Sequence, residues 1–393
     1  METFLNVGGR SYGSEARLDF DELGINEVVD LLDNTNMEAV LRDFGDRNQK
    51  EDPVMHFFEG FLQEYDSKIR KDRGVFYTPL PVVSYIVRSV DEQLRTEFGL
   101  EDGLADTSTW GEMVALIPDL KIPKGTSPDQ FFVQILDPAT GTGTFPVEVI
   151  DVIHKTMTAK WRLQGNREAE IEELWNEYVP EHLLRRLHGY ELMMAPYAIA
   201  HMKIGLKLYQ TGYRFERDER VRIYLTNALE APHDFSGTLS FAIPALAHES
   251  EAVNTIKQDK RFTVVIGNPP YAVMSGNLSE EARRLIDPYR YVDGKKITER
   301  SMLRFEMHLQ DDYVKFLALC QSILKKSGEG AFGFITNNGY LDNLTLRGVR
   351  NALIQDFKAI HLLNLHGNRL RVSRQSNIVD QNVFEIGHGG AIV

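Results

Sequence analysis

The stretch VVIGNPPYAV, at residues 264–273, ends a run of apolar residues in the tetrad Asn268-Pro269-Pro270-Tyr271. A rigid polar segment at the end of a buried strand could act on an amino group that is conjugated to a ring. Such an amine is a poor nucleophile, because its lone pair is delocalised. Two acceptors, the side-chain oxygen of Asn268 and the main-chain carbonyl of Pro269, would favour a pyramidal amine whose lone pair points at an electrophilic methyl group.

The prolines and the tyrosine of the tetrad would support this chemistry. Proline rings fix φ and therefore make the direction of the carbonyl group rigid. The ring of Tyr271 offers a flat face for a base swung out of its helix, and such stacking is worth ~1–3 kcal/mol per base. The simpler interpretation is a turn, since Asn-Pro often opens turns. The strand before the tetrad and the glycine loop described next favour the chemical interpretation.

A glycine loop, residues 137–143, connects an expected strand to an expected helix in ILDPATGTGTFPVEV. Gly141 and Gly143 allow the backbone to bend tightly and to approach a ligand. Asp137 stands at the end of the strand. The dinucleotide fingerprint G-x-G-x-x-G is not met, because Pro146 occupies the place of the third glycine. The loop indicates a ligand site, with a plain strand-to-helix turn as the alternative.

The next expected strand, in HGYEL, ends at Glu191. A carboxylate there can accept both hydroxyl groups of a ribose. The charged segment at residues 167–187 predicts an inserted helix, which explains why the spacing from the glycine loop exceeds the usual ~20 residues. The alternative for Glu191 is an ordinary carboxylate at a strand end.

From about residue 131 onward, short apolar runs alternate with helical patterns, which is typical of a parallel sheet wound with helices. The expected strands lie at residues 132–136, 187–192, 222–229, 263–267, 330–336, 359–365 and 383–393. We therefore predict an α/β, doubly wound, mostly parallel seven-stranded sheet. Ligands bind such sheets at the carboxyl ends of the strands. Four of these ends carry Asp137, Glu191, Asn227 and Asn268.

The N-terminal part of the chain has a different pattern. Residues 1–70 show apolar residues at helical spacing and predict a helical region, followed by one domain over residues 71–393. Thr78 as N-cap and Pro79 at the first helical position predict the start of another helix. Residues 99–130 are rich in turn formers and predict a surface loop.

The composition limits the class of protein. A net charge of −13 argues against a generic nucleic-acid coat protein, so a DNA-binding protein would need a local basic patch or a partner. No apolar run is long enough to cross a membrane, and no signal peptide is recognisable, so we expect a cytoplasmic protein. The single cysteine, Cys320, lies in a helical pattern that predicts burial. The histidines lack the spacing of a metal site, and no nucleoside-triphosphate loop is present.

The segments GVFYTP, DPATGTGTF, GYE, TNA and NPPY, in this order, resemble the S-adenosylmethionine-dependent adenine-N6 DNA methyltransferases of restriction-modification systems. The order is that of their gamma group. The sequence over residues 50–393 is most similar to the methyltransferase module of single-polypeptide, ATP-dependent (Type ISP) restriction enzymes. The resemblance implies methyl transfer from S-adenosylmethionine to the N6 amine of a flipped adenine in DNA.

The resemblance also implies roles for individual residues. Tyr77, Thr78 and Pro79 would close over the methionine end of the cofactor, and Glu191 would hold its ribose. The remaining cofactor-binding residues would be Asp137, Ala139, Thr140, Gly141, Gly143, Asn227, Ala228 and Asn268. The catalytic residues would be Asn268, Pro269, Pro270, Tyr271 and Phe384, the last as a second aromatic ring against the flipped base.

Members of this group carry a target-recognition domain after the methyltransferase module, and none is recognisable here. We therefore expect a fragment, or a protein whose target recognition is supplied by a partner. Arg369, Arg371 and Arg374 lie in a segment without acidic residues, HGNRLRVSRQSN, and are candidates for phosphate contacts. A solvated or partner-paired loop is the alternative for this segment.

Two other functions fit parts of the pattern. Methyltransferases that modify a glutamine side-chain amide use a similar NPPY, because an amide nitrogen presents the same two N–H bonds. Their chains are shorter, and GVFYTP and NVFEI are not part of their pattern. A cofactor-binding, non-catalytic subunit of a larger defence assembly is the other alternative.

Overall fold

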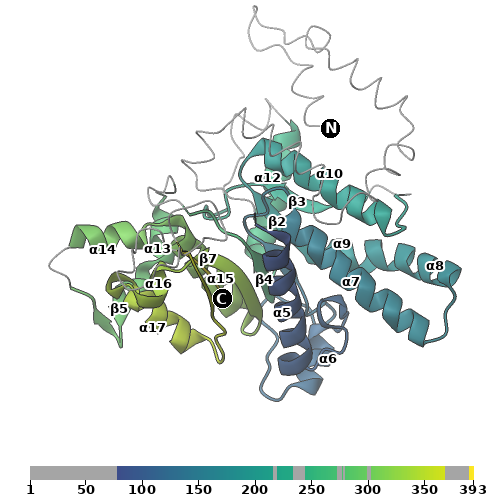
Figure 1. Cartoon of the computed structure of the whole chain (residues 1–393), viewed down its shortest axis with the longest axis horizontal. Helices are drawn as coiled ribbons and strands as arrows, with labels where there is room; N and C mark the ends of the chain where they lie inside the picture. The colour runs from purple at the N-terminus through teal and green to yellow at the C-terminus, as the bar shows by residue number, and fades with distance from the viewer. Residues whose placement is uncertain are drawn as a thin grey trace, which may run out of the picture. The chain divides into compact units, whose positions relative to one another are not determined.

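The computed structural model describes residues 78–215, 219–232, 244–271, 277, 279–298, 302–367 and 389–393. The chain divides into two compact units, one formed by Met1–Asp72 with Asp234–Ala252 and the other by Arg73–His233 with Val253–Val393. The second unit holds the sheet, whose strands are drawn in colour in Figure 1. The helical region expected at residues 1–70 lies outside the described residues.

A seven-stranded sheet forms the centre of this unit, in the order β3-β2-β1-β4-β7-β9-β8. The strands are β1 (Ile135–Asp137), β2 (Leu187–Glu191), β3 (Arg222–Leu225), β4 (Val264–Gly267), β7 (Ala331–Asn337), β8 (Leu363–His366) and β9 (Gly390–Ile392). The pairs from β3 to β7 are parallel, whereas β9 is antiparallel to both β7 and β8. The predicted α/β fold with a mostly parallel seven-stranded sheet is confirmed.

The helices connect the strands in the manner of a doubly wound fold (Figure 1). The longer ones are α5 (Leu80–Phe98), α6 (Trp110–Leu116), α7 (Thr144–Leu163), α8 (Glu168–Tyr178), α10 (Met194–Gln210), α12 (Pro244–Asp259), α14 (Met302–Leu309), α15 (Asp312–Ser327) and α17 (Arg347–Asp356). The shorter elements are η1 (Gly103–Ala105), η2 (Val179–Leu183), α9 (Leu184–Arg186), α13 (Glu280–Leu285), η3 (Asp287–Arg290), the hairpin of β5 (Tyr291–Val292) and β6 (Lys295–Lys296), α16 (Gly339–Asp342) and η4 (Leu344–Leu346).

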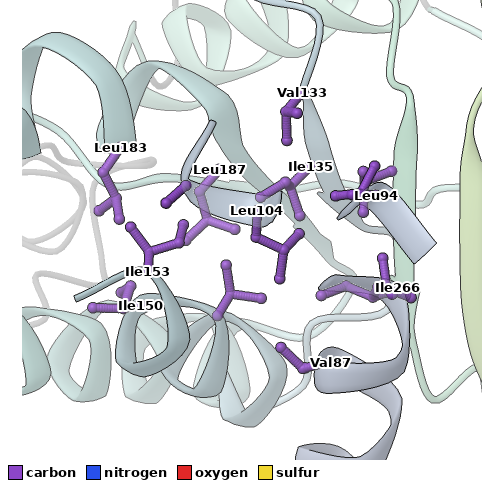
Figure 2. Close-up of a cluster of buried hydrophobic side chains, with 14 of the residues drawn as sticks. Val87, Leu94, Leu104, Val133, Ile135, Ile150, Ile153, Leu183, Leu187 and Ile266 are labelled. Atoms are coloured by element: carbon purple, nitrogen blue, oxygen red, sulfur yellow. The ribbon is translucent and has the colours of Figure 1, made fainter. Parts of the chain in front are cut away.

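Both faces of the central strands are covered. Every residue of β4 is buried, although successive side chains of a strand point to opposite faces. On one face, Ile135 of β1 and Ile266 of β4 pack with side chains of α5 and α7, including Val87 and Ile150 (Figure 2). Helix α15, which contains the buried Cys320, contacts β7. The strands therefore form a rigid layer whose carboxyl ends can present loops.

The inserted helix predicted at residues 167–187 is confirmed by α8, η2 and α9. The expected strands agree with the observed ones in place, but several are shorter. The first begins at Ile135 rather than at residue 132, and the sixth begins at Leu363 rather than at 359. Of the expected last strand, only residues 389–393 are described, and they contain β9.

Residues 99–130 do not form the expected surface loop. They contain η1 and α6, and Trp110 is fully buried in the core. The start of α6 is a capping box, in which Thr109 accepts from the N–H of Glu112 and the Glu112 carboxylate accepts from the N–H of Thr109. The buried guanidinium of Arg186 donates to the carbonyl oxygens of Leu104 and Asp106, which ties this segment to α9.

The predicted start of α5 was wrong by one residue. Pro79 is the N-cap, and its carbonyl accepts the N–H groups of Val82 and Val83. Thr78 lies before the cap, and its side chain makes no capping bond. The hydroxyl group of Thr78 is therefore available for another partner.

Helix α5 approaches β7 closely at Gly333. A Cβ atom on Gly333 would lie 2.8 Å from methyl groups of both Ile86 and Val90. Real Cβ atoms do not come this close to their neighbours, so a larger residue would displace the helix or the strand. The position of α5, and of Thr78 just before it, depends on this contact.

We predict that Gly333→Ala lowers the free energy of unfolding by ~1–3 kcal/mol through overpacking. Urea denaturation of the two proteins measures this difference. Gly205→Ala is a suitable control, because a Cβ on Gly205 would meet no described atom within 4 Å and the glycine lies inside helix α10. The control should be neutral or slightly stabilising; equal effects of the two substitutions would contradict the role given to Gly333.

Candidate functional site

Strands β1 and β4 are neighbours in the sheet although more than 120 residues separate them. Ile135 pairs with Val264 and Leu136 with Val265 in parallel register. The chain builds β1 to β3 on one side and then crosses back to start β4 on the other side of β1. Loops that leave adjacent strands in opposite directions open a space for a ligand at this point. The glycine loop and the tetrad follow these two strands.

The two segments touch at Gly267, the last residue of β4. A Cβ atom there would lie 2.8 Å from Oδ1 of Asp137. Only glycine allows this approach without moving the carboxyl group. The structure thus brings Asp137 and the tetrad together at one edge of the sheet.

The glycine loop has the backbone conformation that glycine favours. Gly141 and Gly143 have φ values of 55° and 83°. The N–H of Gly143 donates to the carbonyl of Thr140 at 2.9 Å, and the Thr140 hydroxyl donates to the carbonyl of Asp137 at 3.1 Å. A Cβ on Gly141 would meet no described atom within 4 Å, so this turn borders open space.

Glu191, at the end of β2, holds the glycine loop. Its Oε2 atom accepts the N–H of Gly141 at 2.8 Å, and its Oε1 atom accepts the N–H of Met193 at 2.8 Å. The side chain is only 8% exposed. Through these two bonds the carboxylate fixes the glycine loop at the carboxyl end of β2.

Asp137 is completely buried. Its Oδ1 atom accepts the N–H of Ala139 at 3.1 Å, whereas its Oδ2 atom has no hydrogen-bond partner among the described residues. Burial raises the pKa of Asp137 to about 8; the Ala139 N–H lowers it and the nearby charge of Glu191 raises it. A buried, unsatisfied carboxyl oxygen beside an open turn suits a positively charged ligand group, which would favour the ionised form.

The amide group of Asn268 is hydrogen-bonded at both ends. Its Nδ2 donates to the hydroxyl oxygen of Thr78 at 2.8 Å, and its Oδ1 accepts the phenol O–H of Tyr271 at 2.7 Å. Tyr271 is 9% exposed, and burial, with the nearby Asp311 and Tyr340, raises its pKa well above the ordinary value. The phenol therefore stays protonated and can donate. The Asn268 oxygen acts as an acceptor in this structure.

Asn227 and Ala228 follow β3 and lie in a well-bonded loop. The Asn227 Nδ2 atom donates to Glu230 Oε1 at 2.9 Å and to Asn277 Oδ1 at 2.8 Å. The ammonium group of Lys257 donates to the main-chain oxygen of Asn227 at 2.7 Å and to that of Glu230 at 3.0 Å. Lys257, on α12, thus fixes the loop that would border the cofactor.

The polar residues at the start of α15 were not among the predicted site residues. Asp312 Oδ1 accepts from Nδ2 of Asn277 at 3.0 Å, and Lys315 donates to the main-chain oxygen of Asn277 at 2.6 Å. Through Asn277 these residues connect to Asn227. Asp311, the N-cap of α15, has a pKa raised to about 7 by burial. The signal was present, because two acidic residues directly precede an amphipathic run in DDYVKFLALC.

Five of the predicted site residues lie outside the described part of the chain: Tyr77, Arg369, Arg371, Arg374 and Phe384. Among the described residues, no group of three His, Cys, Asp or Glu side chains is placed to hold a metal ion. In the same part of the chain, no helix combines the length and the apolar character that a membrane span requires.

The order of the strands in the sheet is that of the fold of S-adenosylmethionine-dependent methyltransferases. Residues 188–370 match the family of the Eco57I restriction-modification methylase. The predicted resemblance to the methyltransferases of restriction-modification systems is confirmed over these residues. No curated protein sequence matches the chain.

Solved structures of restriction-modification enzymes are similar to this chain. A structure of DrdV in complex with DNA has 26% sequence identity and a TM-score of 0.59, and the match covers 86% of this chain and 28% of DrdV. The ATP-dependent Type ISP restriction-modification enzyme LlaBIII bound to DNA has 22% identity and a TM-score of 0.61, over 99% of this chain and 24% of LlaBIII.

A nuclease-deletion mutant of the Type ISP enzyme LlaGI, in complex with a DNA substrate mimic, has 21% identity and a TM-score of 0.61, over 99% of this chain and 29% of LlaGI. The similarity to LlaBIII and LlaGI, at 22% and 21% identity, shows that these two enzymes share the fold of this chain. The chain spans less than a third of the length of each of the three enzymes.

The raised pKa of Asp137 predicts a pH dependence of stability. The folded chain keeps a proton on this carboxyl group up to a pH of about 8, whereas the unfolded chain loses it at about 4. The folded state therefore binds more protons between these values, and the free energy of unfolding falls as the pH rises through this range. Above a pH of about 8 the contribution no longer changes.

Urea denaturation between pH 5 and 8 should show a shallower fall for Asp137→Asn than for the wild type. Asp311 contributes in the same direction to both proteins, because its pKa is also raised. The exposed Asp129→Asn serves as a control and should keep the wild-type slope. Equal slopes for Asp137→Asn and the wild type would mean that Asp137 is ionised in the folded protein.

Proposed function

We propose that this domain is a DNA methyltransferase that moves a methyl group from S-adenosylmethionine to the N6 amine of adenine, within a restriction-modification or phage-defence system. The observation that carries the proposal is the position of Asn268. Asn268 directly follows β4, and the glycine loop follows the neighbouring strand β1. The side-chain oxygen of Asn268 accepts a hydrogen bond. An acceptor at this place suits an amine that must be oriented towards a methyl donor.

Asn268 would accept a hydrogen bond from one of the two N–H groups of the amine. The same oxygen accepts the Tyr271 O–H at 2.7 Å, and an amide oxygen can accept two hydrogen bonds. The carbonyl of Pro269 would accept the other N–H, with its direction limited by the proline rings. Two fixed acceptors favour the pyramidal amine and stabilise the positive charge that develops on nitrogen. A general base is not needed before the attack, because the amine becomes acidic only after methylation.

The described residues fit S-adenosylmethionine. The unsatisfied oxygen of Asp137 suits a positively charged group, the carboxylate of Glu191 is the type of acceptor that ribose hydroxyls bind, and the open turn at Gly141 leaves room beside them. Asn227 and Ala228 would border the adenine of the cofactor. When bound, the cofactor supplies a methyl group activated by a sulfonium.

DNA is the proposed substrate, since the match to the Eco57I restriction-modification methylase family supports it and DrdV and LlaBIII were solved with DNA. The target adenine would leave the duplex and stack on Tyr271, with Phe384 as the second ring. Arg369, Arg371 and Arg374 are proposed to contact phosphates. The net charge of −13 favours a separate target-recognition domain or specificity subunit that supplies further DNA contacts.

The methylated product tests this proposal directly. Unmethylated plasmid and genomic DNA are incubated with the protein and S-adenosylmethionine carrying an isotope-labelled methyl group, then digested to nucleosides and examined by mass spectrometry. We expect labelled N6-methyladenine. Label on a protein glutamine instead of DNA would favour the amide methyltransferase, and cofactor binding without any transfer would favour a non-catalytic subunit.

Asn268→Ala should lower kcat by ~10²–10³-fold, the usual loss when one preorganised hydrogen-bonding group at the reacting atoms is removed. Cofactor affinity, measured by calorimetry, should survive, because the glycine loop and Glu191 are unchanged. Asn166→Ala is a matched control: Asn166 is also partly buried and its amide donates to a main-chain oxygen far from the site. Wild-type activity of Asn268→Ala would refute its role.

Two substitutions separate the role of the Tyr271 ring from that of its hydroxyl group. Tyr271→Phe keeps the stacking surface and removes only the hydrogen bond to the Asn268 oxygen, so we expect the KM for DNA to stay within about threefold. Tyr271→Ala removes the ring and should raise this KM by about 10- to 100-fold, in line with ~1–3 kcal/mol per stacked base. Steady-state kinetics on one DNA substrate measures both. Equal KM values for the two variants would exclude stacking as the role of the ring.

A further inference from the structure

Thr78 has a different partner from the one that the family resemblance implies. The resemblance assigns its YTP segment to the methionine end of the cofactor. In the structure, the Thr78 hydroxyl oxygen accepts Nδ2 of Asn268 at 2.8 Å. The side chain is 6% exposed and comes from a segment 190 residues away from Asn268. This contact connects the start of α5 to the tetrad.

The direction of the Asn268 amide matters for the proposed reaction. The two ends of an asparagine side chain have nearly the same shape, but the nitrogen donates and the oxygen accepts. A target amine presents N–H donors, so it needs the oxygen. If the amide were rotated by 180°, Nδ2 would face the target amine, and a donor would then face a donor.

Thr78 stabilises the productive direction. With Nδ2 on Thr78 and Oδ1 on the Tyr271 O–H, both ends of the amide have a suitable partner. The phenol of Tyr271 stays protonated and can donate, since burial raises its pKa. The acceptor on the other side is the hydroxyl of a threonine, whose two heavy atoms on Cβ limit χ1 rotation. Removal of this hydroxyl takes away the acceptor that the partly buried Nδ2–H group has now, which favours other orientations.

The backbone of Thr78 is held by the docking of α5. The helix begins two residues later, and its Val83 and Ile86 side chains are buried in the core that includes Ile266 of β4. Gly333 allows the same helix to approach β7. Thr78 is therefore supported by the strand that carries Asn268 and by the neighbouring strand.

We propose that Thr78 is a positioning residue for the methyl transfer: its buried hydroxyl group holds the Asn268 amide so that Oδ1, and not Nδ2, faces the target amine. This inference rests on the proposed function, because it assigns Asn268 the role of acceptor. It departs from a cofactor-binding role for the Thr78 side chain. The two roles predict different kinetic changes.

The test compares Thr78→Val, which has nearly the same shape without the hydroxyl group, with Thr78→Ser, which keeps it. We expect Thr78→Val to lower kcat by about 10- to 100-fold, as small errors in the position of a reacting group do. The Kd of S-adenosylmethionine, measured by calorimetry, should change by less than about twofold. Thr78→Ser should recover most of kcat, because it restores the acceptor.

Thr158→Val is the matched control. Thr158 is also 6% exposed, and its hydroxyl donates to the main-chain oxygen of His154 within α7, away from the tetrad. This variant should keep the wild-type kcat. The inference is overturned if Thr78→Val keeps kcat, if it weakens cofactor binding and leaves kcat unchanged, or if serine does not restore kcat.

A second measurement does not need activity and separates this inference from the proposed function. In a double-mutant cycle on urea unfolding, Thr78→Val and Asn268→Ala should have effects that are less than additive, because each removes the same contact. Additive effects would overturn the inference. If the wild type transfers no methyl group but the cycle shows coupling, the contact stands and the proposed function fails. If the wild type methylates adenine and Thr78→Val does so equally well, only the inference fails.

Discussion

The parallel pairing of β1 with β4 is the constraint on which the site depends. Backbone hydrogen bonds between these strands place their carboxyl ends side by side, and the reversal of strand order at this point separates the loops that follow. Gly267 then allows Asp137 to lie against the end of β4. Groups that are far apart in the sequence meet here because sheet pairing fixes them. A shift of one residue in register would exchange the side chains of β4 between the two covered faces of the sheet, so packing on both faces also protects the geometry of the site.

Much of this arrangement could be predicted from the sequence, and the reason is physical. Alternating apolar runs and helical patterns specify a wound parallel sheet, and such a sheet has only one kind of edge at which polar strand ends meet. That rule was enough to group Asp137, Glu191, Asn227 and Asn268. The inserted helix at residues 167–187 was also recognisable, because its charge and apolar spacing are local properties.

Other features could not be predicted, because they depend on tertiary contacts or on competing local signals. Residues 99–130 contain many turn formers, but Trp110 and the Arg186 guanidinium stabilise a helix there through contacts with distant residues. The capping box of Thr109 and Glu112 is a local signal for a helix start. The many turn formers around it favoured a loop instead. Thr followed by Pro is typical of a helix start, and this pattern predicts Thr78 as the N-cap. No local rule indicates that its hydroxyl group bonds to a residue 190 positions away. The same holds for Asn277, whose partners lie on β3's loop and on α15.

Most polar side chains of the site are held by hydrogen bonds within the protein, and Asp137 is the exception among those described. Glu191, Asn227 and Asn268 each have hydrogen-bond partners that fix their side chains, so little reorganisation is required of them when a ligand binds. Asp137 differs, because Oδ2 is buried without a partner among the described residues and its pKa is raised to about 8. A cationic group bound beside it would lower this pKa and release a proton near neutral pH. The cost of burying this carboxyl group is therefore recovered most fully by a positively charged ligand, and this electrostatic preference favours a sulfonium cofactor with its ammonium group over an uncharged nucleoside at the same loop.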